Sequence, residues 1–273
     1  MFSMLLCIAA PAPAVDVAPS AATPLVIGES FAIASRILQE TRHINVYAAR
    51  AWDTPPDARL PVLYMPDGGI AEDFLHIAGL LQVSVANGTM RPFLLVGIQN
   101  TQRRRDLTGP TDEPKDRAIA PVVGGAAAYR GFIRDELMPQ VRQRYRVTPE
   151  TAIVGESLAG LFVVETFLLE PQLFDHYLAF DPSLWWYRGA LPSRAASLLA
   201  AHGGAHHSLY LASSSEAGIA SEVQRLEQVL MESRPKGLEW HVERMPQETH
   251  GTIYHPAALK AFRAVLAPEM DKL

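Results

Sequence analysis

Short apolar runs alternate with amphipathic stretches along most of this chain. The apolar runs predict β-strands at residues 31–34, 45–48, 61–65, 93–98, 151–154, 177–180, 209–212 and 238–242. Apolar residues at helical spacing between them predict helices over 74–85, 133–145, 161–170, 219–230 and 256–266. Strands that alternate with helices indicate an α/β fold, with a mostly parallel central sheet and helices on both faces. The first two strands predict a hairpin or an edge pair.

Polar residues follow several of the predicted strands directly. They are Asp67, Ser157, Asp181, Glu216 and His250. Parallel strands bring their carboxyl ends to the same edge of a sheet, and functional loops gather there. We therefore expect the chemistry of the protein at this one edge.

Ser157 lies between an apolar strand and an apolar helix, in the segment Gly155-Glu156-Ser157-Leu158-Ala159-Gly160. A strand, a tight turn with serine at its apex and a helix form the layout of a nucleophile elbow. Small residues are needed beside the serine because the helix packs close to the strand. Gly155 fits this pattern, and Ala159 replaces the glycine of the stricter motif with one extra methyl group.

A nucleophilic serine needs a histidine base, and the histidine needs an orienting carboxylate. Among nine histidines, His250 follows the last predicted strand, where the chain order of an α/β-hydrolase places the base. His255, directly before Pro256 at the start of a predicted helix, is the nearest alternative. The acid is expected after the strand between those of the serine and the histidine, which favours Glu216. Asp181, one strand earlier, is the alternative acid, and Glu216 at a helix start has the alternative role of stabilising the helix dipole.

The anion of a tetrahedral intermediate needs two backbone N–H donors. Leu158, directly after the serine, is one candidate donor. Gly69, in the loop after the 61–65 strand, is the other, because glycine lets the backbone approach a ligand closely. A simple tight turn is the alternative interpretation of Asp67-Gly68-Gly69.

In this order, these motifs resemble the esterase D-like branch of the α/β-hydrolases over about residues 28–267. The resemblance extends to Arg103-Arg104-Arg105-Asp106-Leu107-Thr108 and Pro182-Ser183-Leu184-Trp185-Trp186, which look most like the siderophore trilactone esterases. It implies an α/β-hydrolase fold and a serine carboxylester hydrolase that forms an acyl-enzyme, acting on siderophore or other aromatic esters. Acyl transfer by the same fold, and a catalytically silent binding protein, are the alternative functions.

Two segments carry candidate substrate-binding residues. Arg105, within the three consecutive arginines, is expected to attract an anionic or catecholate substrate, and a solvated charged loop is the alternative. Trp185 is expected to wall an aromatic acyl pocket, with core packing of the loop as the alternative, while Trp186 is expected to pack into the core.

Composition limits the partners of the chain. Of its 273 residues 48% are hydrophobic and 19% are charged, and the net charge of −5 argues against nucleic acid as a partner. No metal motif is visible, so we expect no cofactor, and the substrate is expected to be a small-molecule ester. An oligomeric state cannot be inferred from the sequence.

The first 24 residues differ from the rest of the chain. An apolar stretch over 2–10 precedes Ala12-Pro13-Ala14 and an Ala/Pro/Ser-rich segment, a pattern typical of a secretory signal peptide although no basic residue precedes it. A disordered tail is the alternative. We expect residues 25–273 to form a single hydrolase domain that is periplasmic or secreted. Cys7, the only cysteine, would then be removed with the signal.

Overall fold

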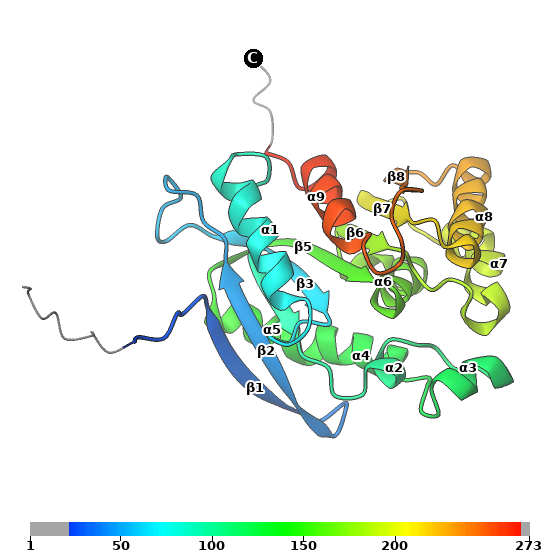
Figure 1. Ribbon diagram of the computed structural model, residues 1–273, viewed down its shortest axis with the longest axis horizontal. Helices are drawn as coiled ribbons and strands as arrows, with labels where there is room; N and C mark the ends of the chain where they lie inside the picture. The colour runs from blue at the N-terminus through cyan, green and yellow to red at the C-terminus, as the bar shows by residue number, and fades with distance from the viewer. Residues whose placement is uncertain (1–21, 269–273) are drawn as a thin grey trace, which may run out of the picture.

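The computed structural model describes residues 22–268, which are organised around one eight-stranded sheet (Figure 1). The strands are β1 Glu29–Ser35, β2 Glu40–Ala48, β3 Leu60–Pro66, β4 Leu94–Ile98, β5 Val147–Glu156, β6 His176–Phe180, β7 His207–Ser213 and β8 Leu238–Arg244. All eight predicted strands are confirmed, with small differences at their ends. Residues 1–21, which hold most of the expected signal peptide, lie outside the described residues.

The strand order is β1-β2-β4-β3-β5-β6-β7-β8. β1, β2 and β4 pair antiparallel, and every pair from β4 to β8 is parallel. Every residue of β3 and β4 is buried, as expected for central strands that are covered on both faces. The predicted hairpin at the edge and the mostly parallel sheet are therefore both confirmed.

The helices connect the strands and cover both faces of the sheet. They are α1 Phe74–Ala86, α2 Arg103–Asp106, α3 Pro114–Ile119, α4 Ala126–Phe132, α5 Met138–Arg144, α6 Leu158–Leu169, α7 Trp186–Ala200, α8 Ala217–Ser233 and α9 Tyr254–Val265. A π-helical turn, η1 Ile133–Leu137, joins α4 to α5, and a 3₁₀ turn, η2 Pro171–Leu173, follows α6.

Two separate hydrophobic clusters pack against the two faces of the sheet. α1 and α9 bury residues such as Ile77 and Phe262 on one face. α4 to α8 cover the other face, where Phe132, Phe162 and Leu226 are fully buried. Figure 1 shows α1 and α9 together on one side of the sheet and α4 and α5 on the opposite side. This α/β-hydrolase architecture leaves the carboxyl ends of the parallel strands as the site for functional loops.

None of the helices between residues 22 and 268 combines the length and the apolar character that a membrane crossing requires.

Candidate active site

Ser157 occupies the sharp turn between β5 and α6. Its backbone has φ 61° and ψ −121°, a strained conformation that its neighbours enforce. The Ser157 N–H donates to the Phe180 carbonyl at 3.0 Å, and the Ser157 carbonyl accepts from the Ser183 N–H at 3.0 Å. A Cβ atom at Gly155 would lie 2.7 Å from the Ala159 backbone, so glycine is required there. The predicted nucleophile elbow therefore has the expected geometry.

His250 reaches the elbow from the loop after β8. Its Nε2 lies 3.0 Å from Ser157 Oγ, and its Nδ1 lies 2.9 Å from Asp181 Oδ2. With the Nδ1–H donated to Asp181, Nε2 is the free acceptor for the serine proton. The three side chains form an unbroken line of hydrogen bonds across the carboxyl ends of β5, β6 and β8.

The acid beside His250 is Asp181, and the expectation that Glu216 holds this position is corrected. Asp181 is fully buried and has φ +42°, a conformation that Asp tolerates better than most residues. The backbone N–H and the Oγ–H of Ser214 both donate to its carboxylate at 2.6 Å. Glu216 instead begins α8 with an exposed side chain, and its N–H donates to Ser214 Oγ at 3.1 Å.

These contacts favour the protonated imidazole. The hydrogen bond to Asp181 raises the pKa of His250 above its ordinary value of 6.5, against the opposing effect of burial. The charges of Glu156, Asp181 and Glu216 add to this rise. The site is therefore arranged to stabilise an imidazolium once His250 has taken a proton.

A second carboxyl group lies beside the same nitrogen. Oε1 of Glu156, the last residue of β5, is 3.3 Å from His250 Nδ1. It is buried and, among the described residues, has no hydrogen-bond partner. Burial raises the pKa of the Glu156 carboxyl to about 7. Glu156 was not predicted as a site residue, although its position directly before the nucleophile is the signal that could have found it.

The two candidate oxyanion donors differ in their surroundings. Leu158 is the first residue of α6, so its N–H has no partner within the helix. The Gly69 N–H donates to Glu72 Oε2 at 2.7 Å. The Leu158 N–H thus has no helical partner to give up, whereas a carboxylate of the protein already occupies the Gly69 N–H.

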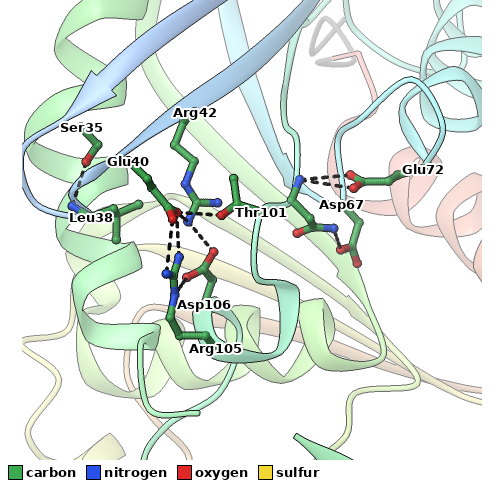
Figure 2. Close-up of polar contacts among 10 residues, drawn as sticks. Ser35, Leu38, Glu40, Arg42, Asp67, Glu72, Thr101, Arg105 and Asp106 are labelled. Atoms are coloured by element: carbon green, nitrogen blue, oxygen red, sulfur yellow. Dashed lines mark hydrogen bonds and ion pairs between the residues drawn. The ribbon is translucent and has the colours of Figure 1, made fainter. Parts of the chain in front are cut away.

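The three arginines after β4 point in different directions. In the helical turn α2 successive side chains are about 100° apart, so Arg103 and Arg105 cannot face the same side. Arg103 pairs with both carboxylate oxygens of Asp67, at 2.7 and 2.8 Å. Figure 2 shows Arg105 turned toward Glu40 and Asp106, whose oxygens each lie 2.7 Å from its guanidinium. The expectation that Arg105 binds substrate is corrected, because its charge belongs to this ion-pair network.

A cleft of about 420 Å³ opens above the serine. Its lining combines apolar and charged side chains from the loops at this edge: Arg103, Arg104, Ile119, Ser157, Leu158, Ser183, Trp185, Glu216, Gly218, Ile219 and His250. Trp185 is among them, as expected, whereas Trp186 is buried and donates its indole N–H to the Gly109 carbonyl at 3.2 Å. Among residues 22–268, no three His, Cys, Asp or Glu side chains are arranged to hold a metal ion.

Comparison with known proteins gives a consistent family. A family model described as "Putative esterase" matches residues 35–256. The ferri-bacillibactin esterase BesA of Bacillus subtilis is 30% identical over 161 residues, which cover 54% of this chain and 56% of BesA. The siderophore triacetylfusarinine C esterase of Aspergillus fumigatus is 34% identical over 155 residues, which cover 50% of this chain and 49% of the relative. The match thus spans about half the length of these relatives.

Solved structures share the fold over nearly the whole chain. An IroE-like serine hydrolase from Shewanella oneidensis has a TM-score of 0.78 and 26% identity, covering 88% of this chain and 80% of its own. The siderophore hydrolase EstA from Aspergillus nidulans has a TM-score of 0.74 and 22% identity, covering 90% of this chain and 97% of its own. The α/β-hydrolase fold expected from the sequence is confirmed.

Proposed function

This chain belongs to that esterase family, and we propose that it is a serine carboxylester hydrolase in which Ser157 is the nucleophile, His250 the base and Asp181 the orienting acid. The observation that carries the proposal is the continuous hydrogen-bonded line from Asp181 through His250 to Ser157 Oγ. A serine hydroxyl is a weak nucleophile until a base takes its proton, and this line supplies the base in the required tautomer.

The reaction follows from these contacts. As Ser157 Oγ attacks the ester carbonyl carbon, its proton passes to His250 Nε2, and the charged imidazolium is stabilised by Asp181. The tetrahedral intermediate collapses when the imidazolium returns the proton to the leaving alkoxide, and Ser157 is left as an acyl ester. Water then attacks this ester with His250 again as the base, and the carboxylic acid product leaves.

The oxyanion of each tetrahedral intermediate is placed at the start of α6. The Leu158 N–H points from the helix N-terminus, where the helix dipole also favours negative charge. We assign the second donor to Gly69, whose N–H becomes available only when the Glu72 carboxylate withdraws from it. Glu72 also accepts from the Asn100 N–H at 3.3 and 3.4 Å, so its withdrawal would free two backbone donors (Figure 2).

The proposed substrates are siderophore esters or other esters with an aromatic, anionic acyl group. Arg104 brings positive charge to the cleft, where the charge of Arg103 is paired with Asp67, and Trp185 provides an aromatic wall. Guanidinium groups bind anionic oxygens and stack on aromatic rings. The names of the relatives BesA and triacetylfusarinine C esterase support this substrate class. The binding role expected for Arg105 passes to Arg104.

The test of the nucleophile is covalent labelling. A fluorophosphonate should modify Ser157 and no other residue, and Ser157→Ala should abolish both labelling and ester hydrolysis while the protein remains folded. Labelling at another serine, or near-normal turnover by the variant, would overturn the assignment. A panel of ferric and iron-free siderophores, feruloyl sugars, acetylated xylan and S-formylglutathione would then define the substrate.

We further propose that the protein is exported to the periplasm or secreted. The support is the composition of residues 1–24, which fits a signal peptide. Sequencing the N-terminus of protein recovered from an exporting host tests this proposal: a new terminus after Ala14 supports it, and an intact Met1 on soluble intracellular protein contradicts it.

A further inference from the structure

The carboxyl group of Glu156 has no role in the mechanism described above, yet it lies at the catalytic histidine. Its Oε1 is 3.3 Å from His250 Nδ1, only slightly farther than Asp181 Oδ2 at 2.9 Å. Oε1 is buried without a hydrogen-bond partner among the described residues, so no other contact fixes it in this place. A buried, unpartnered carboxyl group is costly to keep and calls for a function.

The surroundings of Glu156 couple it to charge on the histidine. The groups that face it come from four elements: His250 after β8, Arg103 on α2, Asp181 after β6 and Asp67 after β3. The two cationic groups favour its ionised form, whereas the two aspartates and burial oppose it. His250 is faced in turn by Asp181, Glu156 and the exposed Glu216. Conversion of His250 to imidazolium therefore makes ionisation of Glu156 more favourable.

We propose that Glu156 is a positioning residue of the active site: a second carboxyl group on Nδ1 of His250 that stabilises the imidazolium and retains part of its orientation when Asp181 is removed. This inference rests on the proposed function. In the wild-type protein the Nδ1–H bonds to Asp181, and a small rotation of the imidazole would transfer that bond to Glu156.

The proposal gives a distinctive pattern in a double-mutant cycle. Loss of the acid from a catalytic triad without a substitute lowers kcat by about 10⁴-fold. With Glu156 as the substitute, Asp181→Asn should lower kcat by only about 10²-fold, whereas Asp181→Asn with Glu156→Gln should approach the full 10⁴-fold loss. The single change Glu156→Gln should cost about tenfold or less, because Asp181 still holds the imidazole.

A pH profile separates positioning from a structural role. Glu156→Gln removes a carboxyl group that raises the pKa of His250, so the acid limb of kcat/KM should move to lower pH. The matched control is Glu216→Gln, which removes an exposed carboxylate near the same histidine and should move the limb less because solvent screens it. An unchanged limb in Glu156→Gln, or a full 10⁴-fold loss in Asp181→Asn alone, would overturn the proposal.

An NMR titration of His250 keeps this test independent of catalysis. The imidazole resonances should titrate at lower pH in Glu156→Gln than in the wild-type protein, with a smaller change in Glu216→Gln. If the wild-type protein neither hydrolyses esters nor reacts with fluorophosphonate, the proposed function fails, and the titration still decides whether Glu156 acts on His250. If the protein is an active esterase and the titration does not change, only the role of Glu156 fails.

Discussion

Replacing Glu156 by glutamine should stabilise the protein, and the gain should be larger at alkaline pH than in mild acid. The side chain is partly buried, with Oε1 fully enclosed, and burial raises the pKa of its carboxyl from 4.5 to about 7. Between these two values the unfolded chain has released the proton that the native protein still holds. The native state binds more protons there, so the stability of the wild-type protein falls as pH rises. Glutamine has nearly the same shape and no such proton.

The size of the effect follows from the two pKa values. A shift of one unit corresponds to about 1.4 kcal/mol, and the pKa of Glu156 rises from 4.5 to about 7. At pH 5 the penalty of the buried carboxylate is about 1 kcal/mol, and at pH 8 it is about 3 kcal/mol, from the linkage relation with these two values. The gain in unfolding free energy from Glu156→Gln should therefore be about 2 kcal/mol larger at pH 8 than at pH 5.

The assay is urea unfolding of the wild-type protein and the variants at both pH values. The raised pKa of His250 also lowers stability as pH rises, because the protonated form that Asp181 favours is lost. The hydrogen bond between His250 and Asp181 is present in both proteins, so the difference between them reports Glu156. Glu216→Gln, with its exposed side chain, should show no comparable gain. A difference between Glu156→Gln and wild type that is the same at pH 5 and pH 8 would refute the reasoning.

Three further predictions, made with five substitutions, test other parts of the site. In ester kinetics, Asp181→Asn should lower kcat by about 10²-fold, whereas Glu216→Gln should change it by about threefold or less. The reverse order would restore Glu216 as the acid. Arg104→Ala should raise KM for aromatic anionic esters severalfold and leave the kinetics with p-nitrophenyl acetate unaffected; equal kinetic effects on both esters would exclude binding by Arg104. Arg105→Ala should instead lower the denaturation midpoint, because the charge of Arg105 is paired with Glu40 and Asp106. Gly155→Ala should cost about 1–3 kcal/mol of stability, measured by urea unfolding, because its Cβ would lie 2.7 Å from the Ala159 backbone; wild-type stability would show that the elbow is not so tightly packed.

The sheet and the elbow were readable from the sequence because their signals are local. Buried parallel strands appear as continuous apolar runs, and β3 and β4 are buried throughout. The helix α7, Trp186–Ala200, was missed because its sequence breaks the helical pattern. Tyr187, Arg188 and Gly189 have positive φ angles, and Pro192 lies inside the helix.

The acid could not be chosen from strand order alone. The order rule favours the loop after β7, where Glu216 lies, but the choice depends on which loop turns back toward the histidine. Asp181 does so because its positive φ bends the chain directly after β6 and because Ser214 supplies two donors to its carboxylate. Ser214 directly follows the neighbouring strand β7. Which strands lie side by side is decided by the tertiary structure and cannot be read from the sequence alone.

The directions of the three arginine side chains could not be predicted for a similar reason. Three consecutive arginines look equivalent in a sequence, but a helical turn separates their side chains by about 100° each. Arg103 pairs with Asp67 at the cleft, while Arg105 enters the network of Glu40 and Asp106. The prediction that this basic loop reaches the site could therefore be right for the loop and wrong for Arg105.

The charges around the elbow suggest why the site keeps a carboxyl group that is only weakly acidic. Arg103, Asp67 and Asp181 contribute a net charge of about −1 with Glu156 and His250 both neutral, counted from their ordinary ionisation states. Proton transfer from Ser157 to His250 brings this sum to zero, so the resting site favours the developing imidazolium. A Glu156 that was always ionised would add a second negative charge, which would repel an anionic substrate at the moment of binding. A carboxyl group whose pKa burial raises to about 7 avoids that repulsion at rest and can still supply its charge once the histidine is protonated.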